Sequence, residues 1–337
     1  MVVVLSAGMK CTCHEFFSCP FVSFRCLKKI RFRSFCDLAG FVLKKCIWAL
    51  FSRLFSFILC LQRYVRNMIK ANYHTHTLLC HHAEGTVDDY CREAVAAGLS
   101  VLGFTDHCPF PDGRWASVRM LMSDLAGYVQ SINQARSNYP QLTILAGLEC
   151  EYVPEFAEFQ RDCFLGEFSL DYLMGAAHSY WYQGEYKGIY GQVLNAAQLQ
   201  AYADYLVDTM ASGLYSVLAH PDLFAMAIWQ WDQAAEACAR KILEKAAHYR
   251  MPLEINAYGL RKPKKEFAEG VRSMYPMREF WRLAAEYDIE VLPGSDAHRP
   301  EDVWGNTDEC IAIAKQFGLK VINEEFLTRV QKVQLPL

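Results

Sequence analysis

The strongest constraint on this 337-residue chain is the position of its metal-binding side chains, which lie at or just after the ends of short strand-like runs. Seven of the ten histidines follow this pattern, as do one glutamate and one aspartate. Histidines scattered over a surface would not all follow apolar β-runs. Imidazole and carboxylate groups together are typical ligands of zinc, manganese and iron. The pattern therefore predicts a multinuclear metal hydrolase whose ligands are His74, His76, His82, His107, Glu149, His178, His220, Asp296 and His298.

Strand-like and helix-like segments alternate after residue 68, which is typical of an α/β fold with a parallel sheet. Most of the strand-like runs are rich in small or branched apolar residues, as expected of strands buried on both faces. These runs are Asn72–Thr77, Val101–His107, Thr143–Tyr152, Tyr172–His178, Tyr215–His220, Leu253–Ala257 and Glu290–Ser295. The predicted helices are one that begins at the Thr86–Asp89 capping box and stops at Gly98, and Ser123–Tyr139, Asn195–Ser212, Asp232–Tyr249, Pro276–Tyr287 and Pro300–Phe317.

Seven such units predict a (β/α) barrel that is one unit short of the usual eight. In barrels of this kind the chemistry lies at the C-terminal ends of the strands. All nine candidate ligands lie at or just after such ends, and Leu253–Ala257 alone contributes none. No internal repeat or low-complexity linker interrupts residues 68–337, so we expect this stretch to be one metal-dependent domain.

The first 67 residues differ from the rest of the chain in charge and composition. They carry 11 basic and 2 acidic side chains, whereas the remaining residues carry 23 basic and 35 acidic ones. The most apolar run, Cys46–Leu61, is too short for the roughly 20 residues that span a bilayer, but a membrane-surface helix is one interpretation. We favour another, in which translation starts at Met68, directly before the first strand, and residues 1–67 are a mis-assigned extension.

The body of the chain is acidic, which argues against nucleic acid as the main partner because phosphate backbones need basic surfaces. Seven of the 14 cysteines lie in the first 67 residues, and the other seven are spread without the spacing of a disulfide framework. We therefore expect reduced thiols and a cytoplasmic location. The sequence does not indicate an oligomeric state.

Two motifs deliver two ligands each. His74 and His76 form an H-x-H pair, and alternate residues of a strand face the same side, so both imidazoles should enter one site. Asp296 and His298 follow a Gly-Ser turn and bring a carboxylate and an imidazole together, which makes them the sharpest motif. His82 lies in a loop beside a second histidine, residue 81, and spacing alone does not decide which of the two binds metal.

The remaining candidates also have structural explanations. In isolation, His178 or His220 would be interpreted as a buried histidine with satisfied hydrogen bonds. A carboxylate at the end of an apolar run is costly to bury unless it is paired or metal-bound, which favours Glu149 as a bridging ligand. Glu151 lies one alternation further along the same face and is the competing choice. Asp106, which directly precedes a candidate ligand, could orient an imidazole, although a lone Asp-His pair is more often structural.

In chain order, the motifs H-T-H, T-D-H, G-L-E, A-H-S, A-H-P-D and G-S-D-A-H resemble those of the polymerase and histidinol phosphatase (PHP) superfamily. The resemblance extends from about Asn72 to about Trp304. The run L-E-I-N-A-Y-G-L-R-K, which begins at Leu253, and the Tyr275-Pro276 pair are similar to the histidinol-phosphatase branch. This resemblance implies a distorted (β/α)7 TIM-like barrel that binds two to three divalent ions of zinc, manganese or iron.

The resemblance also implies how the ligands are shared. The first metal would be bound by His74, His76, Glu149 and Asp296. Glu149 would bridge to a second metal held by His178 and His220. The third metal would be held by His82, His107 and His298, so motif position favours His82 over its neighbouring histidine.

A member of this branch is expected to be a phosphomonoesterase that hydrolyses L-histidinol phosphate, a step of histidine biosynthesis, through a metal-bound hydroxide. The groups expected to carry catalysis are Asp296, His298, Glu149 and His220. Phosphate also favours a guanidinium fork, for which the candidates are Arg261 and Arg299. The aromatic residues 180–182 could form a lid over an imidazole ring, or could equally pack within their loop.

Two other functions are compatible with the same residues. One is a phosphoesterase that acts on another small phosphate ester or on a nucleotide. The other is a non-catalytic, metal-binding accessory module. The expected partner of the enzyme is a small phosphorylated substrate, and contact with a membrane is expected only if residues 1–67 belong to the protein.

Overall fold

The structure is a computed structural model that describes residues 2–4, 10–12 and 69–333. The chain divides into two compact units, Met1–Asn67 and Met68–Leu337. In the first unit, β1 (Val2–Val4) pairs antiparallel with β2 (Lys10–Thr12). The surface helix considered for Cys46–Leu61 and the translation start proposed at Met68 fall outside the described residues. Within the described ranges, no helix is both long and apolar enough to cross a bilayer.

The second unit is built on an eight-stranded sheet in the order β14-β13-β10-β9-β6-β5-β4-β3, in which neighbouring strands are parallel. Seven of the strands overlap the seven predicted runs, which confirms the α/β fold. The eighth, β14, contains only two residues and was not predicted. The strands are β3 (Ala71–Asn72), β4 (Val101–Phe104), β5 (Thr143–Glu151), β6 (Tyr172–Ala176), β9 (Val217–Leu218), β10 (Leu253–Asn256), β13 (Glu290–Gly294) and β14 (Lys320–Val321).

The sheet curls until its two ends meet beyond the regular ladders. Thr75, which follows β3, forms an isolated parallel bridge with Ala297, which follows β13. The backbone N–H of His76 donates to the Ala297 carbonyl at 2.9 Å. This contact joins β3, the first strand of the unit, to β13, the last long strand. The sheet therefore closes into the distorted barrel that the resemblance implied. Because it lies past the ladders, it joins the two chain segments that carry His74, His76, Asp296 and His298.

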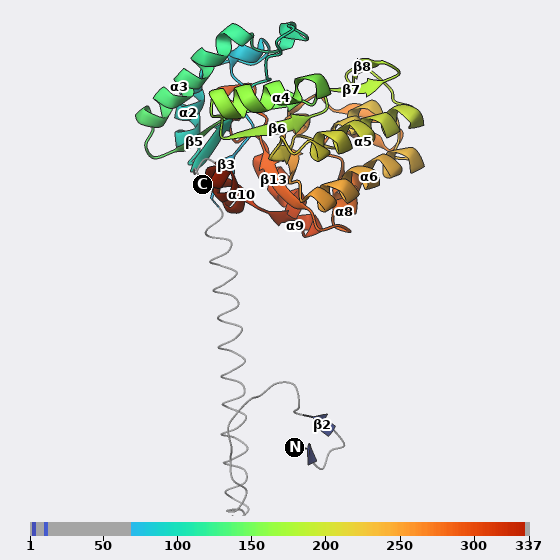
Figure 1. The fold of residues 1–337 in the computed structure, drawn as a ribbon. Coiled ribbons are helices and arrows are strands. Elements are labelled where there is room, and N and C mark those ends of the chain that lie inside the picture. The colour runs from blue at the N-terminus through green and yellow to red at the C-terminus, as the bar shows by residue number, and fades with distance from the viewer. Residues whose placement is uncertain (1, 5–9, 13–68, 334–337) are drawn as a thin grey trace, which may run out of the picture. The chain divides into compact units, whose positions relative to one another are not determined.

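Helices cover the outside of the sheet, with α2 and α3 on one side and α5 and α6 on the other (Figure 1). The predicted helices are confirmed to within a few residues, except that Pro300–Phe317 is divided into a short 3-10 turn and α9. Thr86 caps α2 through the predicted capping box. The long helices are α2 (Val87–Ala96), α3 (Leu125–Asn138), α5 (Ala196–Ala211), α6 (Gln233–Tyr249), α8 (Arg278–Ala284), α9 (Thr307–Phe317) and α10 (Asn323–Val333), and α4 (Ala157–Phe159) continues as a π-helix over Gln160–Glu167.

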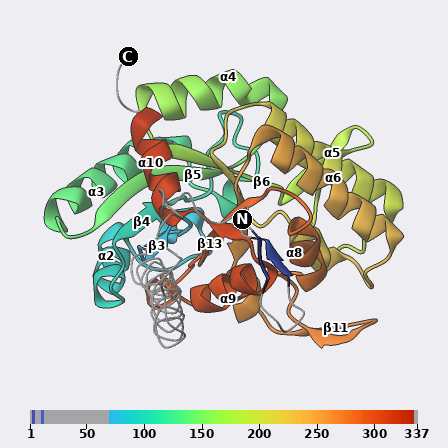
Figure 2. The ribbon, with the colours of Figure 1, turned by 90° about the horizontal axis from the view of Figure 1, so that it is seen from below.

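The end of the barrel opposite the ligands is filled by apolar side chains. Phe326 of α10 packs edge-on against Tyr73 and Tyr172, with ring centroids 4.8 and 5.8 Å apart. The Tyr73 hydroxyl donates to the Asn323 carbonyl at 2.5 Å, so this buried phenol is satisfied. The helix α10, which was not predicted, thus contributes to the interior of the barrel (Figure 2). Burial of this apolar surface stabilises the scaffold and leaves the polar groups to the opposite end.

Two hairpins that were not predicted extend from the ligand end. One joins β7 (Ser179–Tyr182) to β8 (Glu185–Gly188), directly after His178. The other joins β11 (Lys265–Phe267) to β12 (Gly270–Arg272), after β10. The first hairpin matters for the site because the chain on either side of it, at Ser179 and at Gly188 to Tyr190, lines the main cavity.

Candidate active site

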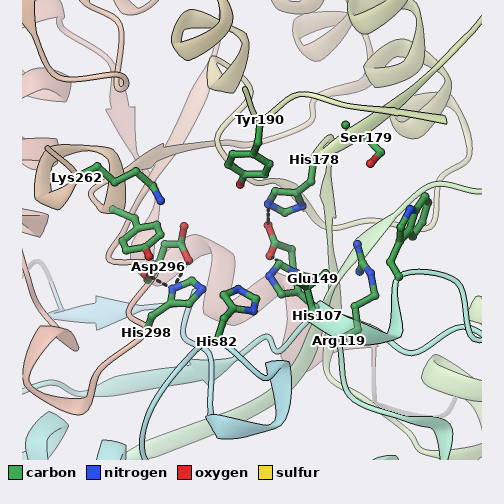
Figure 3. A pocket seen from close by; sticks show the side chains of 14 residues that line it. His82, His107, Arg119, Glu149, His178, Ser179, Tyr190, Lys262, Asp296 and His298 are labelled. Atoms are coloured by element: carbon green, nitrogen blue, oxygen red, sulfur yellow. Dashed lines mark hydrogen bonds and ion pairs between the residues drawn. The ribbon is translucent and has the colours of Figure 1, made fainter. Parts of the chain in front are cut away.

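The nine predicted ligands converge at the C-terminal end of the barrel, beside a cavity of about 340 Å³. Six of them line the cavity, whereas His74, His76 and His220 lie beneath it and are almost completely buried. Figure 3 shows His82, His107, His178, Glu149, Asp296 and His298 directed toward one another. Side chains from six different strand ends therefore meet at one point, as the barrel topology requires.

Glu149 of β5 is the centre of this cluster. Its Oε1 lies 2.9 Å from His220 Nε2 and 3.6 Å from His178 Nε2. Its Oε2 lies 3.0 Å from His107 Nδ1 and 3.5 Å from the Nε2 atoms of both His74 and His76. One carboxylate thus faces two separate groups of imidazoles, one on each oxygen, which is the arrangement expected of a bridging ligand.

Asp296 takes a similar position among the imidazoles that follow β3. Its Oδ1 lies 3.2 Å from His76 Nε2 and 3.5 Å from His74 Nε2. The two imidazoles themselves approach with their Nε2 atoms 3.0 Å apart. Three groups of these kinds around one small space form a donor set for a divalent ion.

A further group of imidazoles surrounds His82. Its ring centroid lies 5.2 Å from that of His107 and 4.9 Å from that of His298. The neighbouring His81 is exposed, and its Nδ1 instead lies 3.1 Å from the Ala116 carbonyl. The geometry therefore favours His82 over His81.

The backbone is strained at two ligands. His220 and Asp296 have positive φ angles of 29° and 49°, which non-glycine residues rarely adopt. The His220 N–H donates to Glu254 Oε2 at 3.1 Å, and the Asp296 carbonyl accepts from Arg261 Nη2 at 3.1 Å. These contacts hold both turns in the conformation that directs the side chains into the cluster.

Two buried carboxylates orient the ligands from behind. Glu254 of β10 accepts from His74 Nδ1 at 2.8 Å, and Glu151 of β5 accepts from His178 Nδ1 at 2.8 Å. Each bond fixes the imidazole tautomer so that Nε2 faces the cluster. Glu254 was missed because it lies in the one strand-like run that contributes no predicted ligand. Glu151, weighed as a bridging ligand, instead has this orienting position.

Asp106 does not orient an imidazole, and that expectation was wrong. Its carboxylate accepts from the Thr77 N–H at 2.8 Å and from the Thr77 hydroxyl at 2.9 Å. Burial raises the pKa of Asp106 to about 7, although both hydrogen bonds from Thr77 lower it. Asp106 therefore fixes the loop that leads from the H-x-H pair toward His82.

The charge states of the cluster suit metal binding. Burial alone would raise the pKa values of Glu149 and Asp296, but the surrounding histidines hold both well below their usual values. Burial lowers the pKa of His107 well below its usual value and that of His298 to about 3. Burial also lowers the pKa of His74, yet Glu254, Asp296 and Glu149 together raise it well above its usual value. Ionised carboxylates among mostly neutral imidazoles are the protonation states that metal ions require.

Unsatisfied atoms support the same conclusion. Among the described residues, Glu149 Oε2 and Asp296 Oδ1 are buried and make no well-directed hydrogen bond, although imidazole nitrogens lie 3.0 and 3.2 Å away. Buried ring nitrogens of His76, His107 and His220 likewise make none. Buried polar atoms without partners are costly and rare. Several triads have ligand atoms close enough to share one ion, including His74-His76-Glu149, His76-His107-His298 and His107-Glu149-His178. The residues present therefore fit a site for metal ions.

The two arginines predicted to bind phosphate do not line the cavity. Arg261 donates to the carbonyls of Gly305 and Ser295, both at 2.6 Å, besides that of Asp296. Arg299 is exposed, and its Nε lies 3.5 Å from Glu84 Oε1. Their roles as phosphate ligands stay predictions. The cations that line the cavity are instead Arg119 and Lys262.

Aromatic rings cover two of the imidazoles. Tyr190 stacks on His178 with ring centroids 6.1 Å apart, and Tyr258 stacks on His298 at 4.6 Å. The residues considered as a lid, 180–182, instead show loop packing, in which Tyr180 contacts Tyr202 and Trp181 contacts Tyr186. The sequence offered no signal for Tyr190, whereas Tyr258 lies in the run that begins at Leu253 and was given no role there.

The model of the PHP domain family matches residues 72–258, which is more than half of the chain. This chain belongs to the PHP family. A relative from Deinococcus radiodurans, named "Probable histidinol-phosphatase", is 33% identical over 256 residues, which cover 74% of this chain and 94% of the relative. The histidinol-phosphatase of Bacillus subtilis is 26% identical, over 70% of this chain and 96% of the relative. These relatives place the chain in the histidinol-phosphatase branch of the PHP family.

The PHP fold is also found among solved structures. A histidinol phosphate phosphatase from Lactococcus lactis, solved with zinc, L-histidinol and phosphate, has a TM-score of 0.59 to this chain and is 20% identical. The match covers 75% of this chain and 95% of the other protein. It confirms the curled parallel sheet of the PHP fold.

Proposed function

We propose that this PHP protein hydrolyses L-histidinol phosphate to L-histidinol and inorganic phosphate, with two or three divalent metal ions. The observation that carries the proposal is the position of Glu149, whose two oxygens face separate groups of histidines from different strands. The relatives named for this activity align over nearly their full lengths, which supports the choice of substrate.

The ligand residues would hold the metals in the groupings that the distances suggest. Bound divalent ions lower the pKa of water and neutralise charge on phosphoryl oxygens. Glu149 supplies one carboxylate to two neighbouring positions, and Asp296 supplies another beside His76. Glu254 and Glu151 hold His74 and His178 in the required tautomers. The chain thus contributes positioning and charge, which phosphoryl transfer requires more than a covalent nucleophile.

The cavity also suits the organic part of the substrate. Trp115, Tyr190 and Tyr258 line it and offer aromatic surface to an imidazole ring. Lys262 lies 3.9 Å from the centroid of the Tyr258 ring, and burial lowers the pKa of its amine. The metals we propose are zinc, manganese or iron, with zinc favoured by its presence in the Lactococcus lactis phosphatase.

The state of the cysteine side chains bears on where in the cell the enzyme acts. The seven cysteines of residues 69–333, from Cys80 to Cys310, are all free thiols. Reduced thiols suit a reducing compartment, so we propose that the enzyme acts in the cytoplasm.

A substrate panel tests the proposed function. The metal-loaded full chain would be assayed for phosphate release from L-histidinol phosphate, p-nitrophenyl phosphate and nucleoside monophosphates. We expect kcat/KM for L-histidinol phosphate to exceed that of the other esters by at least about 100-fold, as pocket contacts to a whole substrate provide. Equal rates, or a preference for a nucleotide, would instead support a phosphoesterase of different specificity.

A further inference from the structure

Arg119 is a buried cation with unused donors in the wall of the active-site cavity. Its side chain is 5% exposed, and it lines the same cavity as Glu149 and His178. One terminal nitrogen, Nη2, pairs with Glu151. Nε and Nη1 are buried and have no hydrogen-bond partner among the described residues. Figure 3 shows the guanidinium near Glu149 and His107.

The surroundings hold this guanidinium in place and keep it charged. Its Cζ lies 5.6 Å from the centroid of the Phe110 ring and 5.1 Å from that of Trp115. Aromatic faces attract a guanidinium and restrict its rotation. The adjacent Glu151 carboxylate keeps the arginine paired on one side only. A preorganised guanidinium with a free terminal donor suits an oxyanion, because an arginine N–H makes a strong charge-assisted hydrogen bond to such an oxygen.

Glu151 connects this arginine to the metal site. One of its oxygens accepts from His178 Nδ1 at 2.8 Å, and the other pairs with Arg119. His178 Nε2 in turn faces Glu149 at 3.6 Å. The carboxylate therefore sets the position of a metal ligand and of the guanidinium at the same time.

We propose that Arg119 binds the phosphoryl group of the substrate through Nη1, and that Glu151 positions it against the metal site. This inference rests on the proposed function only in taking the ligand to be a phosphate ester. It does not depend on which alcohol the phosphate is attached to. Arg119 and Lys262 together would then supply the positive charge that Arg261 and Arg299 were predicted to supply.

The test measures binding of inorganic phosphate to the metal-loaded full chain by titration calorimetry, so it does not depend on the identity of the ester. Arg119→Met should weaken phosphate binding about 10- to 100-fold, since a charge-assisted hydrogen bond is lost. The metal content, measured by mass spectrometry, should stay unchanged. Arg119→Lys should restore part of the affinity, because it keeps the charge but not the planar guanidinium.

Arg114→Met is the matched control. Arg114 stacks on the same rings of Phe110 and Trp115, but its guanidinium pairs with Asp112 and Glu155. It does not line the cavity, so its substitution should leave phosphate affinity unchanged.

Two results would overturn the proposal. One is unchanged phosphate affinity in metal-loaded Arg119→Met. The other is weaker binding that follows entirely from lost metal, because Arg119 would then act only as a support for Glu151 and His178. If Arg119→Met fails to fold, Arg119→Ala with added methylguanidine provides the same comparison. Rescue of phosphate binding by methylguanidine would support the proposal. Folded Arg119→Ala without rescue would refute it. Failure of the wild type to hydrolyse L-histidinol phosphate, with phosphate binding intact, would refute the proposed substrate alone.

Discussion

His74 Nδ1 donates to Glu254 Oε1 at 2.8 Å, and both side chains are completely or almost completely buried. Glu254 is not a ligand, yet it fixes the tautomer of His74 and also accepts from the backbone N–H of His220. One carboxylate therefore orients two ligands that come from different strand ends. β10 supplies none of the predicted metal ligands, but its Glu254 supports two of them.

Substitution Glu254→Gln should weaken metal binding without removing a ligand. The amide can present its NH₂ to His74, which favours the wrong tautomer and directs a protonated Nε2 toward the metal. Losses of this kind are about 10- to 100-fold in metal affinity or activity. Competition with a fluorescent zinc chelator measures the change, and unaltered affinity in a folded variant would contradict the orienting role.

The close approach of the Glu254 carboxylate requires a glycine at position 294. A Cβ at Gly294 would lie 1.9 Å from Glu254 Oε1, so Gly294→Ala must displace Glu254. We expect a loss of unfolding free energy of about 1–3 kcal/mol together with weaker metal binding. Gly127→Ala is the control, since Gly127 lies in α3 with nothing within 4 Å of the added Cβ. That variant should be about 0.5–1 kcal/mol more stable, through helix propensity. Equal effects in the two variants, measured by urea unfolding, would contradict the packing argument.

Glu149→Gln should abolish metal-dependent activity. The substitution removes the charge that faces His107, His178 and His220 and leaves those imidazoles without their shared carboxylate. We expect at least about a 1,000-fold fall in kcat/KM, in the range that catalytic groups acting as a unit produce. Metal analysis should show fewer bound ions per chain. Wild-type metal content with wild-type activity would exclude a bridging role for Glu149.

The pair of Glu151 and Arg119 should make the metal-free protein sensitive to acid. Burial alone would raise the pKa of Glu151, but Arg119 and His178 lower it to about 2. A carboxylate whose pKa is depressed in the folded state stabilises the fold above its unfolded value of about 4.5, and this contribution is lost as the pH falls toward 2.

The difference in unfolding free energy between wild type and Glu151→Gln should therefore be about 3 kcal/mol at pH 6 and should shrink below pH 4.5. Denaturant unfolding at pH 6, 4.5 and 3.5 measures it. A difference that stays constant over this range would show that the carboxylate is not ionised through the pair.

Much of the fold was predictable because its signals are local. Short apolar runs identify seven strands. The Thr86 capping box and the helical spacing of apolar residues identify most helices. β14 is only two residues long and carries no such pattern, and α10 contributes Phe326 to a core that only the closed barrel creates. Strand ends were overestimated because residues such as Thr75 are extended without belonging to a ladder.

The convergence of the candidate ligands was predictable, since parallel strands bring their C-terminal ends together. The supporting residues were not. Glu254 looks like one polar residue in an apolar run, and Arg119 lies outside any periodic segment. Their roles depend on partners about 180 and 30 residues away in the chain, which only the folded structure identifies.

Metal-dependent turnover of L-histidinol phosphate tests the central claim most directly. Phosphate release would be followed for the full chain after chelation, after reloading with zinc or manganese, and for reloaded Asp296→Ala. The account predicts no activity after chelation, recovery on reloading and at least about a 1,000-fold lower kcat/KM in the variant. Turnover that survives chelation, or that the variant retains, would contradict a catalytic metal centre at the end of this barrel.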